Sequence, residues 1–292
     1  MHGRSTMTAA GLAGEGSAPA IGPAGVRGGG ALDLAFARRE ERTVLARSFQ
    51  AGCLRARLPR PEQRGEPPCA VVINTAGGVV GGDRLEQRVA WGQDTTATVT
   101  TQAAEKIYRT LADGATISAE LRVGRGARAE WLPQETILFD AARLRRDLRI
   151  VLAEDVTFLG LEATVLGRKA TGETVRSGAL RDCLRIWRND RLIYADALTL
   201  DGDVAGLMTQ AAIGDGVAAI AVIVHASATA SELLPAVREA LSRARGLGAA
   251  STWNGLLATR LLAADGETLR HDIALALSAL RGGRALPRVW SC

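Results

Sequence analysis

Hydrophobic and polar residues alternate with a period of two over much of the chain, from about Leu32 to Ile193. Successive side chains of a β-strand point to opposite faces, so this period predicts strands with one buried and one exposed face. The alternation is most regular from Ala115 to Val123, and residues 148–152 repeat it. The Thr-rich run Asp94 to Thr101 and the apolar run Ala70 to Ile73 also predict strands.

Turn signals separate these strands at short intervals. They are Gly77-Gly78, Gly81-Gly82, Asp113-Gly114, Gly124 to Gly126 and Asn189-Asp190. No helical periodicity lies between them, so βαβ units are not expected. The pattern predicts an antiparallel or coiled all-β architecture.

The last third of the chain has a different character. Ser231 to Gly246 predicts a helix with Pro235 in its first turn. Glu267 to Arg281 predicts a second helix, because leucine and isoleucine recur on one face and Gly282-Gly283 follows as a stop. Val217 to Val224 predicts a buried strand. We therefore expect a mainly β fold, a large coiled arrangement of many short strands with two α-helices near the C-terminus.

Composition bounds the domain organisation. Of the 292 residues, 47% are apolar and 23% are charged, which suits a globular fold with a sizeable core. Residues 1–30 are rich in Gly, Ala, Ser and Pro, so we expect a flexible N-terminal tail followed by a single β-rich domain over 31–292. No apolar run approaches the roughly 18 residues of a membrane span, and no hydrophobic signal segment is evident. We therefore expect a cytoplasmic protein without a membrane partner.

The charge pattern is basic but mixed. The net charge of +5 rests almost wholly on arginine, because Lys106 and Lys169 are the only lysines. Arginines alternate with acids, as in residues 143–147, so a diffuse surface of mixed sign is expected. An acidic protein partner is the second interpretation and nucleic acid the third, and the 4% aromatic content disfavours a base-stacking surface. The four cysteines are widely scattered and predict neither a disulfide framework nor a zinc site.

A glycine-rich segment, Asn74 to Asp83, holds two Gly-Gly pairs around two valines. A phosphate-binding loop would need Lys and then Ser or Thr after the last glycine, whereas Asp83 and Arg84 stand there. The GxGxxG spacing is also absent. What remains is a backbone excursion that glycine permits and that ends in an acid, serving either as a structural turn or as a functional loop.

Three further segments carry charged residues. Thr101 to Arg109 holds both signs and is interpreted as a solvated strand edge or turn. In Glu130 to Asp140, Glu135 and Asp140 flank an apolar run and could act as general acid and base, which leaves an uncharacterised hydrolase as an alternative. Residues 161–173 add Glu162 and Glu173. No GxSxG nucleophile elbow accompanies them.

Taken together, the segments resemble the UreD (UreH) family of urease accessory proteins. The matching stretches are NTAGGVVGGDRL (74–85), TTQAAEKIYR (100–109), WLPQETILFDAARLRR (131–146), LGRKATGE (166–173) and ALPRVW (285–290). Their order covers nearly the whole chain from Leu32 onward. The resemblance implies a large coiled β body with two helices, in agreement with the hydrophobic pattern.

The resemblance also implies a function. Family members are not enzymes; they bind apo-urease together with UreF and UreG and assist GTP-dependent insertion of nickel, with UreG as the GTPase. They are thought to conduct nickel along an internal water-filled passage. On that basis we expect no tightly bound cofactor and only transient Ni²⁺, because carboxylate and water bind it more weakly than imidazole or thiolate. The acids expected to line the passage are Asp83, Glu135, Asp140, Glu162 and Glu173. The C-terminal helices and the arginine-rich surface are expected to dock UreF or urease.

Overall fold

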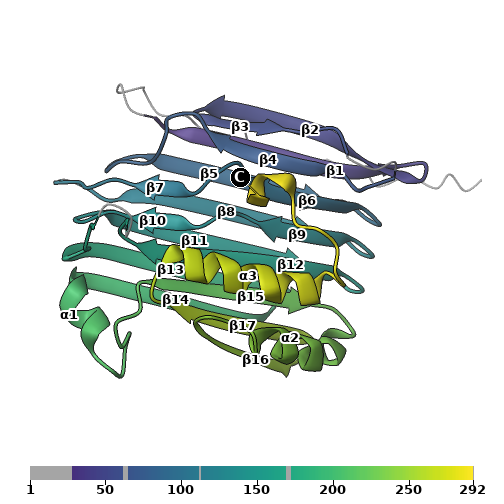
Figure 1. Cartoon of the computed structure of the whole chain (residues 1–292). Helices are drawn as coiled ribbons and strands as arrows, with labels where there is room; N and C mark the ends of the chain where they lie inside the picture. Colours follow the sequence, from purple (N-terminus) through teal and green to yellow (C-terminus); the bar gives the residue numbers. More distant parts are fainter. Residues whose placement is uncertain (1–27, 62–64, 112, 169–171, 292) are drawn as a thin grey trace, which may run out of the picture.

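The computed structural model describes residues 28–61, 65–111, 113–168 and 172–291. Within them the chain coils between two facing β-sheets, and each turn of the coil stacks on the one before it (Figure 1). Most of the predicted N-terminal tail, residues 1–27, lies outside the described residues, and Gly30 already begins the first strand. The prediction of a mainly β, coiled fold is confirmed.

Sheet A has seven strands, of which the five central ones run parallel and the two edge strands run antiparallel to them. In spatial order they are β14 (Arg191–Asp203), β13 (Ser177–Arg188), β11 (Arg143–Leu152), β8 (Ala115–Val123), β5 (Arg84–Trp91), β1 (Gly30–Arg39) and β2 (Arg42–Gly52).

Sheet B has ten strands, eight of them in one continuous order. These are β16 (Leu247–Trp253), β17 (Leu256–Ala263), β15 (Ala219–Ala226), β12 (Thr157–Leu166), β9 (Arg128–Leu132), β6 (Thr96–Thr101), β4 (Cys69–Asn74) and β3 (Leu54–Arg57). The short strands β7 (Glu105–Ile107) and β10 (Thr136–Leu138) pair with each other, and β10 pairs with β12.

The two longer helices pack against sheet B. A 3-10 turn, η2 (Ala230–Leu233), leads into α2 (Leu234–Leu241), with Pro235 in the first turn as predicted. The second predicted helix is α3 (Gly266–Leu280), which begins where the Asp265 side chain accepts a hydrogen bond from the amide of Thr268. The first helix ends earlier than predicted. Two features were not predicted: the short α1 (Val204–Thr209) and the hairpin of β16 and β17 between α2 and α3.

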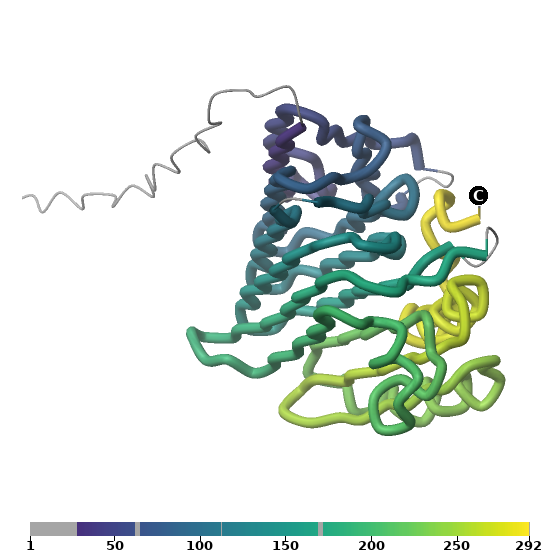
Figure 2. Tube along the Cα trace, turned by 90° about the vertical axis from the view of Figure 1, so that its left-hand side faces the viewer, coloured from purple at the N-terminus to yellow at the C-terminus, as the bar shows by residue number. Residues whose placement is uncertain are grey.

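The buried apolar residues form two layers, because side chains alternate between the two faces of sheet B. One lies between the sheets and the other between sheet B and the helices, as in strand β12, where Phe158 faces the first layer and Leu159 the second. Figure 2 shows this layering, with α2, α3 and the C-terminal 3-10 turn η3 (Arg288–Ser291) on the side of sheet B away from sheet A. None of the helices in the described part of the chain is long and apolar enough to cross a membrane.

Candidate functional site

A buried charged cluster interrupts the apolar layer between the two sheets. Arg146 on β11 of sheet A extends to Glu162 on β12 of sheet B, with 2.9 Å between Nη1 and Oε2. It also binds its sheet neighbour Asp182 on β13, with 2.9 Å between Nε and Oδ1. The three side chains are at most 15% exposed. Because two carboxylates surround one guanidinium, the cluster carries one excess negative charge when all three groups are ionised.

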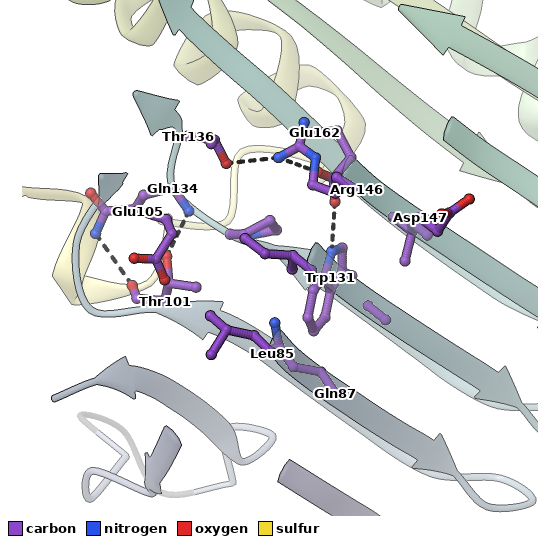
Figure 3. Close-up of a pocket in the computed structure, with 14 residues that line it drawn as sticks. Leu85, Gln87, Thr101, Glu105, Trp131, Gln134, Thr136, Arg146, Asp147 and Glu162 are labelled. Carbon is purple, nitrogen blue, oxygen red and sulfur yellow. Dashed lines mark hydrogen bonds and ion pairs between the residues drawn. The ribbon is translucent and has the colours of Figure 1, made fainter. Parts of the chain in front are cut away.

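Neighbouring strands complete the hydrogen bonds of this cluster (Figure 3). Arg146 donates to the hydroxyl of Thr136 at 2.7 Å and to that of Thr164 at 3.2 Å. The indole of Trp131 donates to Glu162 at 3.1 Å. Burial raises the pKa of Glu162, and the positive charge of Arg146 opposes that rise. The cluster is therefore held by five strands, and Glu162 is the carboxylate that burial makes hardest to keep charged.

Two cavities meet at this cluster, because Arg146 and Glu162 line both of them. The first, of about 60 Å³, extends toward the N-terminal strands and is also lined by Thr101, Glu105 and Gln134. The second, of about 80 Å³, extends toward the C-terminal strands. A water molecule needs roughly 10–15 Å³ of such volume and a few polar partners, so both cavities have room for several waters. The two cavities thus lie on either side of the buried cluster, toward opposite ends of the stacked strands.

Glu105 supplies a second acid to the first cavity. Its carboxylate accepts a hydrogen bond of 3.0 Å from the side chain of Asn74. Burial raises its pKa to about 7, and the negative charge of Asp83 adds to the rise, while the hydrogen bond from Asn74 opposes it. The interpretation of this segment as a solvated edge was wrong for Glu105, because β7 turns its side chain inward against the glycine-rich loop.

The glycine-rich loop has the backbone that its sequence predicts. Gly77, Gly78 and Gly82 all have positive φ angles, and Val79 pairs with the backbone of Lys106 on β7. Asp83 ends the loop as a buried acid: its Oδ2 accepts a hydrogen bond of 2.9 Å from the amide of Val80, and its Oδ1 has no hydrogen-bond partner among the described residues. The loop thus has a structural role, because its backbone hydrogen-bonds to β7.

The other three predicted acids lie elsewhere. Glu135 pairs with Arg270 of α3 at 3.2 Å. Asp140 accepts the backbone amides of Arg176 and Ser177 at 2.7 and 3.0 Å. Glu173 accepts a hydrogen bond of 3.3 Å from the backbone amide of Asp140, so these two acids lie close together.

Of the five acids predicted to line the passage, only Glu162 lines the two cavities. The proposed acid–base pair of the hydrolase alternative is also divided between different partners, an arginine for Glu135 and backbone amides for Asp140. Among the described residues, no three His, Cys, Asp or Glu side chains come together as a metal-binding group.

Arg146 and Asp182 were missed, although the sequence carries a signal for both. Arg146 occupies the inward phase of its strand, between Leu144 and Leu148, and Asp182 does so between Leu180 and Leu184. A charged residue in the buried phase of an alternating strand requires a buried partner. That mismatch could have identified the cluster.

The fold and the interior define a class of protein: a two-sheet β-coil with helices on one side and a charged, cavity-lined interior. The model of the family described as "UreD urease accessory protein" matches residues 28–291. The chain is 45% identical over 258 residues to the urease accessory protein UreD of Rhizobium rhizogenes, covering 88% of this chain and 93% of that protein. It is 46% identical to the protein of the same name from Methylobacterium sp. strain 4-46, over 85% of this chain and 89% of that protein. The chain therefore belongs to the UreD family of urease accessory proteins.

Proposed function

We propose that this protein serves urease maturation by giving Ni²⁺ a path through its interior toward apo-urease, in a complex with UreF and UreG. Family membership supports the maturation role. The path would run from the first cavity, past the buried cluster of Arg146, Glu162 and Asp182, into the second cavity. Nickel is cargo here and not a resident cofactor.

The observation that carries this proposal is the excess carboxylate at the junction of the two cavities. A hydrated divalent cation entering the interior loses favourable hydration, and a buried negative charge offsets part of that loss. Glu162 faces both cavities, so a cation could approach it from either side. Arg146 holds this carboxylate in place and limits the net charge, so the attraction stays moderate.

Ligands that bind Ni²⁺ weakly suit a path through which the ion passes. Ni²⁺ binds imidazole and thiolate tightly, whereas carboxylates and water release it more readily. Along the proposed path the cation would meet Glu105 and then Glu162, with water completing its coordination. The protein would contribute the path and the scaffold, and the GTP hydrolysis that drives maturation would belong to UreG.

Cytoplasmic location is part of the proposal. Three cysteines of the described chain, Cys53, Cys69 and Cys183, are free thiols, as expected in a reducing compartment.

The test is nickel content and activity of urease in cells that carry the urease genes, with this gene deleted, restored, or restored as Glu162→Gln. The glutamine keeps an acceptor for Trp131 but removes the excess charge. We expect deletion to leave abundant, nickel-poor urease, the wild-type gene to restore it, and the variant to restore severalfold less nickel.

Glu239→Gln serves as the matched control, because Glu239 is exposed on α2, far from the cavities in the fold. Thermal unfolding of each variant separates loss of the path from loss of the fold. Full nickel loading with Glu162→Gln would refute the path, and full loading after deletion would refute the maturation role itself.

A further inference from the structure

The outer face of sheet A concentrates arginine. Alternation directs every second residue of its strands outward, and these outward residues include nine exposed arginines on five strands of the described chain. They are Arg47, Arg84, Arg88, Arg122, Arg143, Arg145, Arg149, Arg181 and Arg185. Strand register therefore collects on one face arginines that are scattered along the sequence, with acids interspersed among them.

The positive charge of this face is only partly neutralised. Acids that point the same way include Asp33, Glu86, Glu120, Asp147 and, on the edge strand β14, Asp201. Arginines therefore outnumber acids on this face, which carries a positive excess. Arg47, Arg122, Arg145 and Arg185 form ion pairs with these acids. The other five arginines make no ion pair with a described acid, so their charge is available to another molecule.

The register aligns these arginines in rows across the sheet. Arg145 lies between Thr116 and Arg181 in one row. Two rows further along the strands, Arg149 lies between Glu120 and Arg185. Strands are spaced by about 4.8 Å and residues along them by about 3.3 Å, so the face measures roughly 30 Å by 30 Å. That is about 900 Å², close to the ~800 Å² that each partner contributes to a stable interface.

No described helix covers this face: α2, α3 and the C-terminal turn lie against sheet B (Figure 2), and α1 packs its buried residues Val204 and Met208 into the layer between the sheets. Stacked-strand proteins commonly use such extended faces for binding. Arginine suits this use, since its planar guanidinium can bind a carboxylate through two hydrogen bonds and stack on apolar surface.

We propose that the outer face of sheet A is a docking surface for the acidic face of a folded protein partner. The positive excess supplies charge complementarity and steers association. The interspersed acids favour a protein over nucleic acid: a phosphate backbone lying across the face would meet Glu86, Glu120 and Asp147, whereas a protein can oppose each charge individually.

The test measures association of the full chain with purified apo-urease and with purified UreF at 50 and 300 mM NaCl. The choice of these two probes rests on the proposed function. The variant replaces three arginines that form no ion pair, Arg88→Gln, Arg143→Gln and Arg181→Gln. We expect the association rate constant with at least one probe to fall about tenfold at 50 mM, and less at 300 mM, because salt screens the attraction.

Two further proteins control this result. The first replaces three exposed arginines outside the face, Arg57, Arg128 and Arg243, by Gln and should bind both probes as the wild type does. The second carries Lys at positions 88, 143 and 181 and should recover most of the association rate, because it keeps the charge.

Unchanged association of the Gln variant with both probes would overturn the docking surface. The docking surface would also be overturned if the wild type bound duplex DNA, the Gln variant did not, and both proteins bound apo-urease and UreF equally well. If the variant binds normally and urease still receives nickel, this proposal fails and the proposed function stands.

Discussion

The fold shifts the pKa of Glu105 enough to make stability depend on pH. Its pKa rises from 4.5 in the unfolded chain to about 7 in the folded protein. Between these values the unfolded chain releases its proton first. The contribution of Glu105 to stability is therefore full below pH 4.5 and falls by roughly 3 kcal/mol as the pH rises to 7.

Glu105→Gln should remove this pH dependence. Glutamine still accepts the hydrogen bond from Asn74 but cannot ionise. We expect the variant to unfold at higher urea than the wild type at pH 8 and at similar urea at pH 4.5, with a difference of roughly 2–3 kcal/mol at pH 8. Glu86→Gln on the exposed face is the control. Parallel pH curves for the wild type and Glu105→Gln would show that Glu105 is not buried as described.

At the scale of the single residue, the sequence predicted the kind of side chain better than its place. It predicted carboxylates in the interior, and Glu162 lies there. It could not predict that Glu135 meets Arg270, because the two are separated by 135 positions and meet only where α3 packs on sheet B. Whether these other acids contact nickel stays a prediction.

Among the elements, the glycine-rich loop is the one that its sequence specifies most closely. At Gly78 the φ angle is +148°, and a Cβ would lie 2.9 Å from the carbonyl oxygen of Lys106. At Gly77 the φ angle is +76°, but a Cβ would meet nothing within 4 Å. Substituting Gly77 would therefore introduce backbone strain alone, whereas substituting Gly78 would introduce backbone strain and a steric clash.

Gly78→Ala should destabilise the protein more than Gly77→Ala. We expect about 1 kcal/mol for Gly77→Ala from its positive φ alone, and at least 2 kcal/mol more for Gly78→Ala, because alanine there also clashes with β7. Urea unfolding of both variants at one pH provides the comparison. Equal losses would mean that the loop does not pack on β7 as closely as described.

The sequence predicted elements well where the periodicity was strong. Helix α3 matches its prediction within a residue at each end, because a buried leucine stripe, an aspartate cap and two glycines agree. Strands β16 and β17 were missed. Their sequences, LGAASTW and LLATRLLA, lack regular alternation; β17 pairs with β15, and β16 adds to the edge of the sheet by pairing with β17.

At the scale of the whole molecule, Arg146 links the two sheets through the buried cluster. Without it, two carboxylates would remain in a low-dielectric interior with no cation between them. Removing one partner of a buried ion pair typically costs 3–5 kcal/mol. The cost should be smaller at low pH, where the abandoned carboxylates take up protons.

Arg146→Met should therefore lower the free energy of unfolding by about 3–5 kcal/mol at pH 8 and by clearly less at pH 5. Arg149→Met provides the matched control, because Arg149 lies on the same strand but is exposed on the outer face. We expect less than about 0.5 kcal/mol for that change. Equal effects of the two variants, measured by urea unfolding, would contradict a buried bridging role.

The sequence by itself determined the class of fold, the turns and the late helices, because these follow from local periodicity, glycine and capping residues. It also carried the family resemblance. Only the tertiary structure decided which charges meet. The buried cluster unites residues 146, 162 and 182, and the outer face gathers the nine named arginines from five strands. The physical reason is that strand register, set by long-range pairing across the sheets, brings together side chains whose separation along the chain gives no sign of contact.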